Sequence, residues 1–239
     1  MNNVQLFCLP FAGGNKYSYR HFERLAPRGL SVIPLELAGR GSRSHEPLAT
    51  SLAVLTDDVF GQIRHKLNQP YAIYGHSMGA LLGYLLTRKI IEEKCNQPLH
   101  LFCTGAGGPS RPLDEPPRYA LPKLQFIDKI REMGGSPDEV LNNEVLMNFF
   151  EPILRADFEA VDTYTYRETE PFDVPVSVIT GLNERITREE AMLWQQETTR
   201  KLYVKHLPGN HFFIFDHQSE ILEIITNKLN QKLNTYENC

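Results

Sequence analysis

Six short apolar runs, separated by helical patterns, limit what this chain can fold into. The runs cover residues 4–9, 31–35, 71–74, 99–104, 176–180 and 203–207, and several are apolar at nearly every position. Strands that are covered on both faces show such continuous runs. Patterns typical of helices lie between or after them, at 19–25, 52–67, 78–94, 188–199 and 219–233. The alternation predicts an α/β fold with a mostly parallel central sheet flanked by helices.

One long stretch between the fourth and fifth runs shows helical patterns only. Pro152 lies inside the strongest of them, and we expect it to kink the helix or to begin a new one. We predict a single domain over residues 1–239 with a helical insertion at about 112–160. An ordinary helical subdomain and a lid over a substrate channel both fit this insertion. Ligands bind at the C-terminal edge of such sheets, which favours the lid.

Composition argues against several classes of function. The formal net charge is −4 at pH 7 and no long basic run is present, so nucleic acid is not an expected partner. No apolar stretch approaches the roughly 18 residues that a membrane span needs, and the N-terminus has no signal-peptide pattern. The four cysteines, Cys8, Cys95, Cys103 and Cys239, show no metal-ligand spacing. We expect a cytoplasmic protein without membrane insertion that needs no metal or other cofactor.

The sequence Gly-His-Ser-Met-Gly at 75–79 separates the third apolar run from a long helical pattern. A plain glycine turn is one interpretation. The other is a nucleophile elbow, a Gly-x-Ser-x-Gly turn that lifts a serine hydroxyl clear of the backbone. The motif alone is weak, but a strand before it and a helix after it are the context that the mechanism requires. We therefore assign Ser77 as the candidate nucleophile.

A serine at neutral pH needs a base, and the base needs a carboxylate that orients it. In this fold the order along the chain is serine, acid, histidine. His211 is the candidate base, because it follows the last predicted strand in a Pro/Gly loop and an apolar run anchors it. His76 is expected to point away from the serine's reaction partner. Glu184 follows the run at 176–180 and is the candidate acid; a solvated carboxylate or an ion pair with Arg185 is the alternative.

Acyl transfer also needs backbone N–H groups that stabilise an oxyanion. The elbow directs the Met78 N–H, at the start of the helix, toward this position. A second donor is expected from the small-residue loop at 10–15, with Ala12 as the first choice and Phe11 as the fallback. A glycine turn without this role is the alternative.

With these residues in place, the chain resembles the type II thioesterases of nonribosomal peptide and polyketide assembly. The likeness runs nearly end to end, through LPFAGGNKYSYRHF, LELAGRGSR, YGHSMGALLGYLL, EMGGSPDEVLNNEVL, PILRADFEAVDTYTY and LPGNHFF. The segment at 152–164 discriminates best, because generic α/β-hydrolases lack it. The resemblance implies an α/β-hydrolase fold in which the insertion is a lid. It also implies hydrolysis of acyl thioesters on the phosphopantetheine arm of acyl or peptidyl carrier proteins, which removes aberrant or stalled acyl groups.

Transferred position by position, the resemblance puts the nucleophile at Ser77, the base at His211 and the acid at Glu184. Three positions depart from the family pattern. Glu184 stands where aspartate is usual, Asn210 replaces the glycine before the histidine, and Ala38 replaces a proline. The first departure bears on the acid, and Asn210 bears on how His211 is presented.

Other functions stay open on the sequence. They are a fatty-acyl carrier-protein hydrolase that ends chain growth, a general carboxylesterase, and a non-catalytic carrier-binding protein, which an intact serine–histidine pair disfavours. Carrier proteins tend to be acidic, so a basic rim at the site would favour docking. For any single basic residue, an ordinary solvated charge is the simpler interpretation. The candidates for the rim are Arg40, Arg43, Arg111, Arg118 and Lys123.

Overall fold

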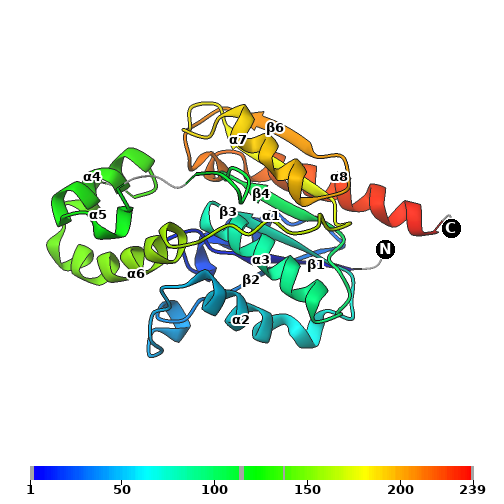
Figure 1. Cartoon of the computed structure of the whole chain (residues 1–239), viewed down its shortest axis with the longest axis horizontal. Helices are drawn as coiled ribbons and strands as arrows, with labels where there is room; N and C mark the ends of the chain where they lie inside the picture. The colour runs from blue at the N-terminus through cyan, green and yellow to red at the C-terminus, as the bar shows by residue number, and fades with distance from the viewer. Residues whose placement is uncertain (1–2, 113–115, 137, 238–239) are drawn as a thin grey trace.

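The architecture is one parallel sheet with helices on both faces (Figure 1). This computed structural model describes residues 3–112, 116–136 and 138–237. Its six strands are parallel in the order β2-β1-β3-β4-β5-β6, which confirms the predicted α/β sheet. The strands are β1 (Val4–Leu9), β2 (Leu30–Pro34), β3 (Tyr71–His76), β4 (Leu101–Thr104), β5 (Val176–Gly181) and β6 (Tyr203–Leu207).

Each face of the sheet has its own hydrophobic core. One core lies beneath α2 (Leu52–Ile63), α3 (Met78–Glu92) and α7 (Arg188–Met192). The other lies beneath α1 (Arg20–Leu25) and α8 (Gln218–Glu237). β1, β3, β4 and β5 are buried at every position, because helices cover both of their faces. This double burial is the physical reason for the continuous apolar runs in the sequence.

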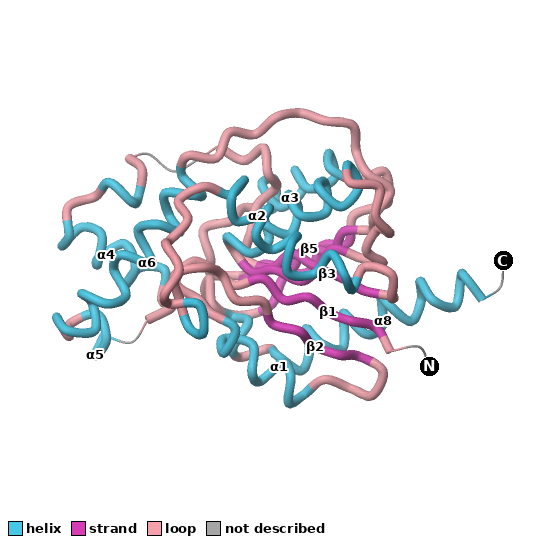
Figure 2. The backbone as a smooth tube through the Cα atoms, turned by 90° about the horizontal axis from the view of Figure 1, so that it is seen from below, coloured by secondary structure: helices cyan, strands magenta, loops and turns pink. Residues whose placement is uncertain are grey.

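The helical insertion lies between β4 and β5, where the sequence predicts it. It consists of α4 (Lys123–Met133), α5 (Asp138–Leu141) and α6 (Glu144–Asp162). Figures 1 and 2 show these helices at one end of the molecule, with α8 extending toward the opposite end. Of the predicted range 112–160, residues 113–115 and 137 lie outside the described residues. The insertion has a small core of its own, formed by Phe126, Ile130, Leu141, Met147, Leu154 and Phe158.

Of the two outcomes expected at Pro152, a kink or a new helix, the second does not occur, because α6 continues through the proline. Met147 and Ile153 are buried on either side of the proline, and this packing outweighs the one lost hydrogen bond. The helix predicted over 188–199 is divided, since α7 ends at Met192 and a 3-10 helix follows over Leu193–Glu197. That tighter turn places Trp194 in the core.

Two cysteines lie in the core. Cys8 and Cys103 are free and buried, and burial raises the pKa of both thiols well above the ordinary value, which suppresses the reactive thiolate. Cys239 lies outside the described residues. Among the helices of the described residues, none has both the length and the apolar character to cross a membrane.

Candidate active site

Ser77 lies in the sharp turn between β3 and α3. Its backbone has φ 55° and ψ −119°, in the positive-φ region that non-glycine residues rarely adopt. Its N–H donates to the Thr104 carbonyl of β4 at 2.8 Å, and its own carbonyl accepts from the Ala80 N–H at 2.9 Å. Hydrogen bonds on both sides of the residue hold this strained turn in place. The geometry is that of a nucleophile elbow.

The two glycines of the elbow are required by close approach of the backbone. A Cβ on Gly75 would lie 2.0 Å from the carbonyl oxygen of Gly79. A Cβ on Gly79 would lie 2.4 Å from the carbonyl oxygen of Leu9 in β1. No side chain fits at either position, so only glycine lets β3, α3 and the end of β1 come this close. The motif thereby brings Ser77 beside the loop at 10–15.

His211 and Glu184 come together from the loops after β6 and β5. His211 Nδ1 lies 2.9 Å from Oε2 of Glu184, whose side chain is 1% exposed. The other carboxylate oxygen, Oε1, accepts the Gly181 N–H at 2.6 Å, so the longer glutamate side chain reaches the imidazole with its carboxylate fixed. Arg185 bonds Glu132 instead, at 2.8 Å. Because Nδ1 donates to Glu184, Nε2 is left as the basic nitrogen of the ring.

Backbone contacts fix the loop that presents His211. The Asn183 N–H donates to the Gly209 carbonyl at 2.9 Å, which joins the loop after β5 to the loop after β6. Oδ1 of Asn210 accepts the Phe212 N–H at 3.0 Å, so this departure from the family glycine closes the turn around His211. Nε2 of His211 is buried and has no hydrogen-bond partner within the described residues.

His76 is closer to the site than the sequence predicts. Its ring centroid lies 4.8 Å from that of His211, and the rings of Phe11 and Phe212 also contact it. Nδ1 of His76 bonds the Thr104 hydroxyl at 3.0 Å. Burial, and to a lesser degree the neighbouring His211, hold the pKa of His76 well below its ordinary value. A neutral ring therefore packs against His211, and no local sequence signal indicates this contact.

Two cavities meet at Ser77 and His211. The first, which we call the polar cavity, has a volume of about 280 Å³. The second, which we call the apolar cavity, lies against all three helices of the insertion and has a volume of about 230 Å³. Ala12 lines both cavities, Met78 the polar one and Phe11 the apolar one. The charged side chains of the polar cavity are Arg111, Arg118, Lys129, Glu132, Glu184 and Arg185.

A buried ion pair fixes the loop after β1. Asp157 of α6 accepts two N–H groups of the Arg40 guanidinium, at 2.6 Å each, and the side chains are 0% and 2% exposed. The same carboxylate accepts the Gly13 N–H at 2.7 Å, and Arg40 also donates to the Gly14 carbonyl at 3.3 Å. The insertion thus holds the loop that contains Ala12. Sequence reasoning missed this contact, because its partners lie far apart along the chain.

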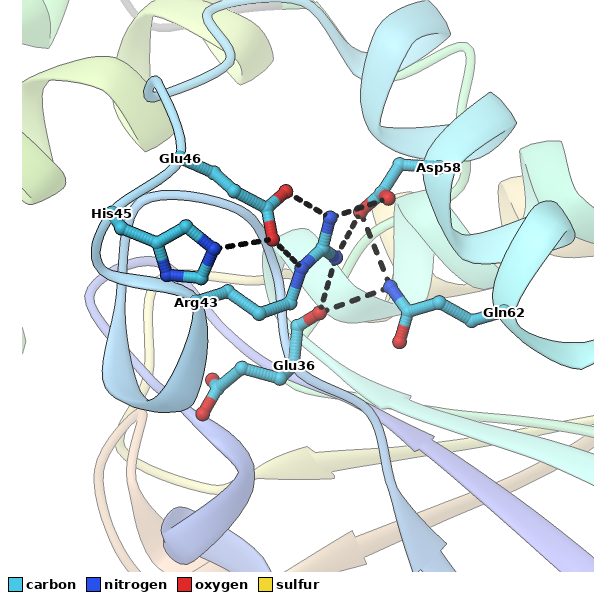
Figure 3. Close-up of polar contacts among 6 residues, drawn as sticks. All are labelled: Glu36, Arg43, His45, Glu46, Asp58 and Gln62. Atoms are coloured by element: carbon cyan, nitrogen blue, oxygen red, sulfur yellow. Dashed lines mark hydrogen bonds and ion pairs between the residues drawn. The ribbon is translucent and has the colours of Figure 1, made fainter.

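Acidic neighbours pair with the basic residues considered for docking. Arg40 is not part of a surface rim, because the ion pair with Asp157 buries it. The Arg43 guanidinium lies between Glu46 and Asp58, with a nitrogen 2.7 Å from each carboxylate (Figure 3). The prediction of a basic rim is therefore wrong for Arg40, and the other candidates are not isolated charges. Their partners are Glu190 for Arg111, Asp162 for Arg118 and Glu151 for Lys123.

The strand order, the elbow after β3 and the loops after β5 and β6 define a class. An elbow at this point of a parallel sheet is the mark of the α/β-hydrolases, and the chain is one of them. Across residues 3–112, 116–136 and 138–237, no group of three or more His, Cys, Asp or Glu side chains is arranged to hold a metal ion.

Comparison with known proteins narrows the class. The model of the family described as "Thioesterase domain" matches residues 4–229. The gramicidin S biosynthesis protein GrsT of Aneurinibacillus migulanus is 34% identical over 227 residues, which cover 95% of this chain and 89% of GrsT. The chain therefore belongs to the thioesterase family, in its type II branch.

Solved structures agree with this assignment. ClbQ, from the colibactin NRPS/PKS pathway, superposes with a TM-score of 0.92 at 28% identity, covering 98% of this chain and 99% of that one. BorB, the type II thioesterase from the borrelidin biosynthetic cluster, has a TM-score of 0.86 at 30% identity, with 95% and 92% covered. The likeness includes the insertion as well as the sheet, because nearly the whole chain is covered.

Proposed function

We propose that this type II thioesterase hydrolyses acyl thioesters on the phosphopantetheine arm of acyl or peptidyl carrier proteins. In doing so it removes aberrant or stalled acyl groups during peptide or polyketide biosynthesis. The observation that carries the proposal is the Glu184–His211 pair, whose histidine lines the same two cavities as Ser77. A thioester has two arms, the acyl chain on one side of the carbonyl carbon and the phosphopantetheine thiol on the other. With its carbonyl carbon at Ser77, each arm has a cavity to occupy.

In the first step, Nε2 of His211 accepts the hydroxyl proton of Ser77 as the serine oxygen attacks the thioester carbonyl. The tetrahedral intermediate carries a negative oxygen, which the N–H groups of Ala12 and Met78 stabilise by about 3 kcal/mol each. The C–S bond then breaks, and the phosphopantetheine thiol leaves with the proton from His211. An acyl-serine remains.

In the second step, His211 removes a proton from water, and the water oxygen attacks the acyl-serine. The C–O bond to Ser77 breaks, the serine recovers its proton from His211, and the free acid leaves. Glu184 holds the imidazole in the required tautomer and stabilises its cation in both steps. The chemistry of this cycle needs only protein groups and water.

The insertion acts as a lid in this proposal. α4, α5 and α6 all contribute side chains to the apolar cavity, so they separate one arm of the substrate from solvent. Excluding water strengthens the electrostatic stabilisation of the oxyanion.

The test is release of acyl groups from a phosphopantetheinylated carrier protein by the wild type and by Ser77→Ala. We expect release by the wild type alone, and irreversible labelling of Ser77 by a fluorophosphonate. Cleavage of oxygen esters without release from the carrier would indicate a general carboxylesterase. Binding to the carrier with neither release nor labelling would indicate a non-catalytic protein.

A further inference from the structure

The apolar cavity has the lining of a hydrocarbon site. Its only charged or titratable lining group among the described residues is His211, which it shares with the polar cavity. Ser77 and Ser136 each add a hydroxyl. The remaining side chains from the insertion are apolar: Ile130 and Met133 of α4, Val140 of α5, and Met147, Phe150, Leu154 and Phe158 of α6.

We propose that this cavity holds the acyl part of the substrate and selects uncharged hydrocarbon acyl groups of up to about eight carbon atoms. The inference rests on the proposed function, because it assumes a thioester at Ser77. It goes further in naming the class of acyl group, which periodicity in the sequence cannot supply.

The linings of the two cavities indicate which part of the thioester each cavity holds. A phosphopantetheine arm has two amides and a phosphodiester, and these groups match the charged side chains that line the polar cavity. An acyl chain has only C–H groups beyond its carbonyl, which match the apolar cavity. Ser77 and His211 line both, so the scissile carbonyl lies between the arms.

The volume limits the length of the acyl chain. An apolar cavity of about 150 Å³ holds a benzene molecule. By the same ratio, the cavity of about 230 Å³ has room for roughly nine carbon atoms. An octanoyl group therefore fits within the cavity, whereas a dodecanoyl group exceeds its volume.

The lining also limits charge. The carboxylate of a malonyl group, or the ammonium of an aminoacyl group, would be buried in a cavity whose only titratable lining group among the described residues is His211, the proposed base. Burying an unpaired charge costs much more than a few buried methylenes contribute. Hydrolysis should therefore favour hexanoyl and octanoyl groups over malonyl and alanyl groups.

The first experiment measures kcat/KM for the same carrier loaded with acetyl, hexanoyl, octanoyl, dodecanoyl, malonyl and alanyl groups. We expect a maximum at hexanoyl or octanoyl, with malonyl and alanyl lower by roughly tenfold or more. Equal rates for malonyl and octanoyl would overturn the inference and leave the proposed function intact. No release from any load beyond the Ser77→Ala background would overturn both.

A matched pair of variants tests the cavity directly. Phe150 is half-buried and lines the apolar cavity, whereas its neighbour Phe149 is 60% exposed and does not. Phe150→Ala enlarges the cavity, so we expect the dodecanoyl-to-octanoyl ratio of kcat/KM to rise by roughly tenfold. Phe149→Ala should leave that ratio unchanged. The same rise in both variants would contradict the assignment.

A second pair of variants tests the effect of reducing the volume of the apolar cavity. It keeps the proposal testable if Phe150→Ala fails to fold. Val140→Phe fills part of the apolar cavity, so the octanoyl-to-acetyl ratio should fall by roughly tenfold. Val145→Phe makes the same chemical change at a position that is 78% exposed. An unchanged ratio in a folded Val140→Phe protein would show that the acyl chain lies elsewhere.

Discussion

Removing the carboxylate charge of Asp157 should weaken both the fold and the catalytic site. In the wild type, Arg40 and Asp157 form a doubly hydrogen-bonded ion pair that is 2% and 0% exposed. Asp157→Asn keeps the size of the side chain and removes its charge. The guanidinium of Arg40 is then buried without a counter-ion. Its Nε atom already lacks a hydrogen-bond partner within the described residues.

The magnitude follows from burial. Removing one partner of a buried ion pair costs about 3–5 kcal/mol of unfolding free energy. This is a large part of the roughly 5–15 kcal/mol that stabilises a typical domain. For a chain of this length it lowers Tm by roughly 6–20 °C. An exposed pair provides the control, because Arg200 and Asp173 are 53% and 61% exposed and solvent screens their charges, so Asp173→Asn should change Tm little.

Activity should fall as well, because the Asp157 oxygen that accepts the Gly13 N–H at 2.7 Å also binds Arg40, and a neutral amide oxygen is a weaker acceptor for both than a carboxylate. That bond fixes the loop in which Ala12 is proposed to donate to the oxyanion. Loss of one oxyanion donor lowers kcat by roughly a hundredfold to a thousandfold. A loop that is only loosened should lower kcat by less than this amount. We expect kcat to fall more than KM changes, since the contact acts on the transition state.

A double variant separates the two effects. Arg40→Met with Asp157→Leu removes both charges, and apolar replacement of a buried pair is often neutral for stability. We expect Tm to recover toward the wild type while kcat stays low, because the leucine side chain offers the Gly13 N–H no acceptor. The assays are thermal unfolding and single-turnover release of octanoate. If Asp157→Asn changes Tm no more than Asp173→Asn does, the reasoning from burial is refuted.

Three further predictions concern pH, packing and chemistry. Burial lowers the pKa of His100 to about 3, below the ordinary value of 6.5, so the unfolded chain binds a proton first as pH falls. Protonation of His100 in the unfolded chain should therefore lower the free energy of unfolding by about 2 kcal/mol between pH 7 and pH 5. Chemical denaturation should show this decrease in the wild type and not in His100→Gln. Gly75→Ala should unfold or strongly destabilise the protein because its Cβ would lie 2.0 Å from the Gly79 carbonyl oxygen. Gly61→Ala in α2, with nothing within 4 Å of its Cβ, should instead raise the unfolding free energy by about 0.5–1 kcal/mol. Glu184→Gln should lower kcat by roughly a hundredfold to ten-thousandfold in steady-state release assays, and a rate near wild type would remove Glu184 from the mechanism.

Much of the fold and the central residues of the candidate site could be predicted from the sequence, because their signals are local. Strands buried on both faces require continuous apolar runs, and the six runs gave all six strands within a few residues. The elbow needs glycine two positions before and after Ser77, since the backbone approaches itself there too closely for a Cβ. Loop position in the predicted topology was enough to select Glu184 and His211, which meet at 2.9 Å.

Only the tertiary structure decided the rest, because it depends on contacts between segments far apart in the chain. Arg40 is a plausible surface cation by sequence, yet Asp157 of the insertion draws it into the interior. His76 at the end of β3 packs on His211, which follows β6 and lies more than a hundred residues further along the chain. The two cavities are spaces between the insertion and the sheet, and their volumes follow from the packing of many side chains. The sequence by itself therefore determined the residues of the candidate site, whereas packing decided how those residues are supported and how large the two cavities are.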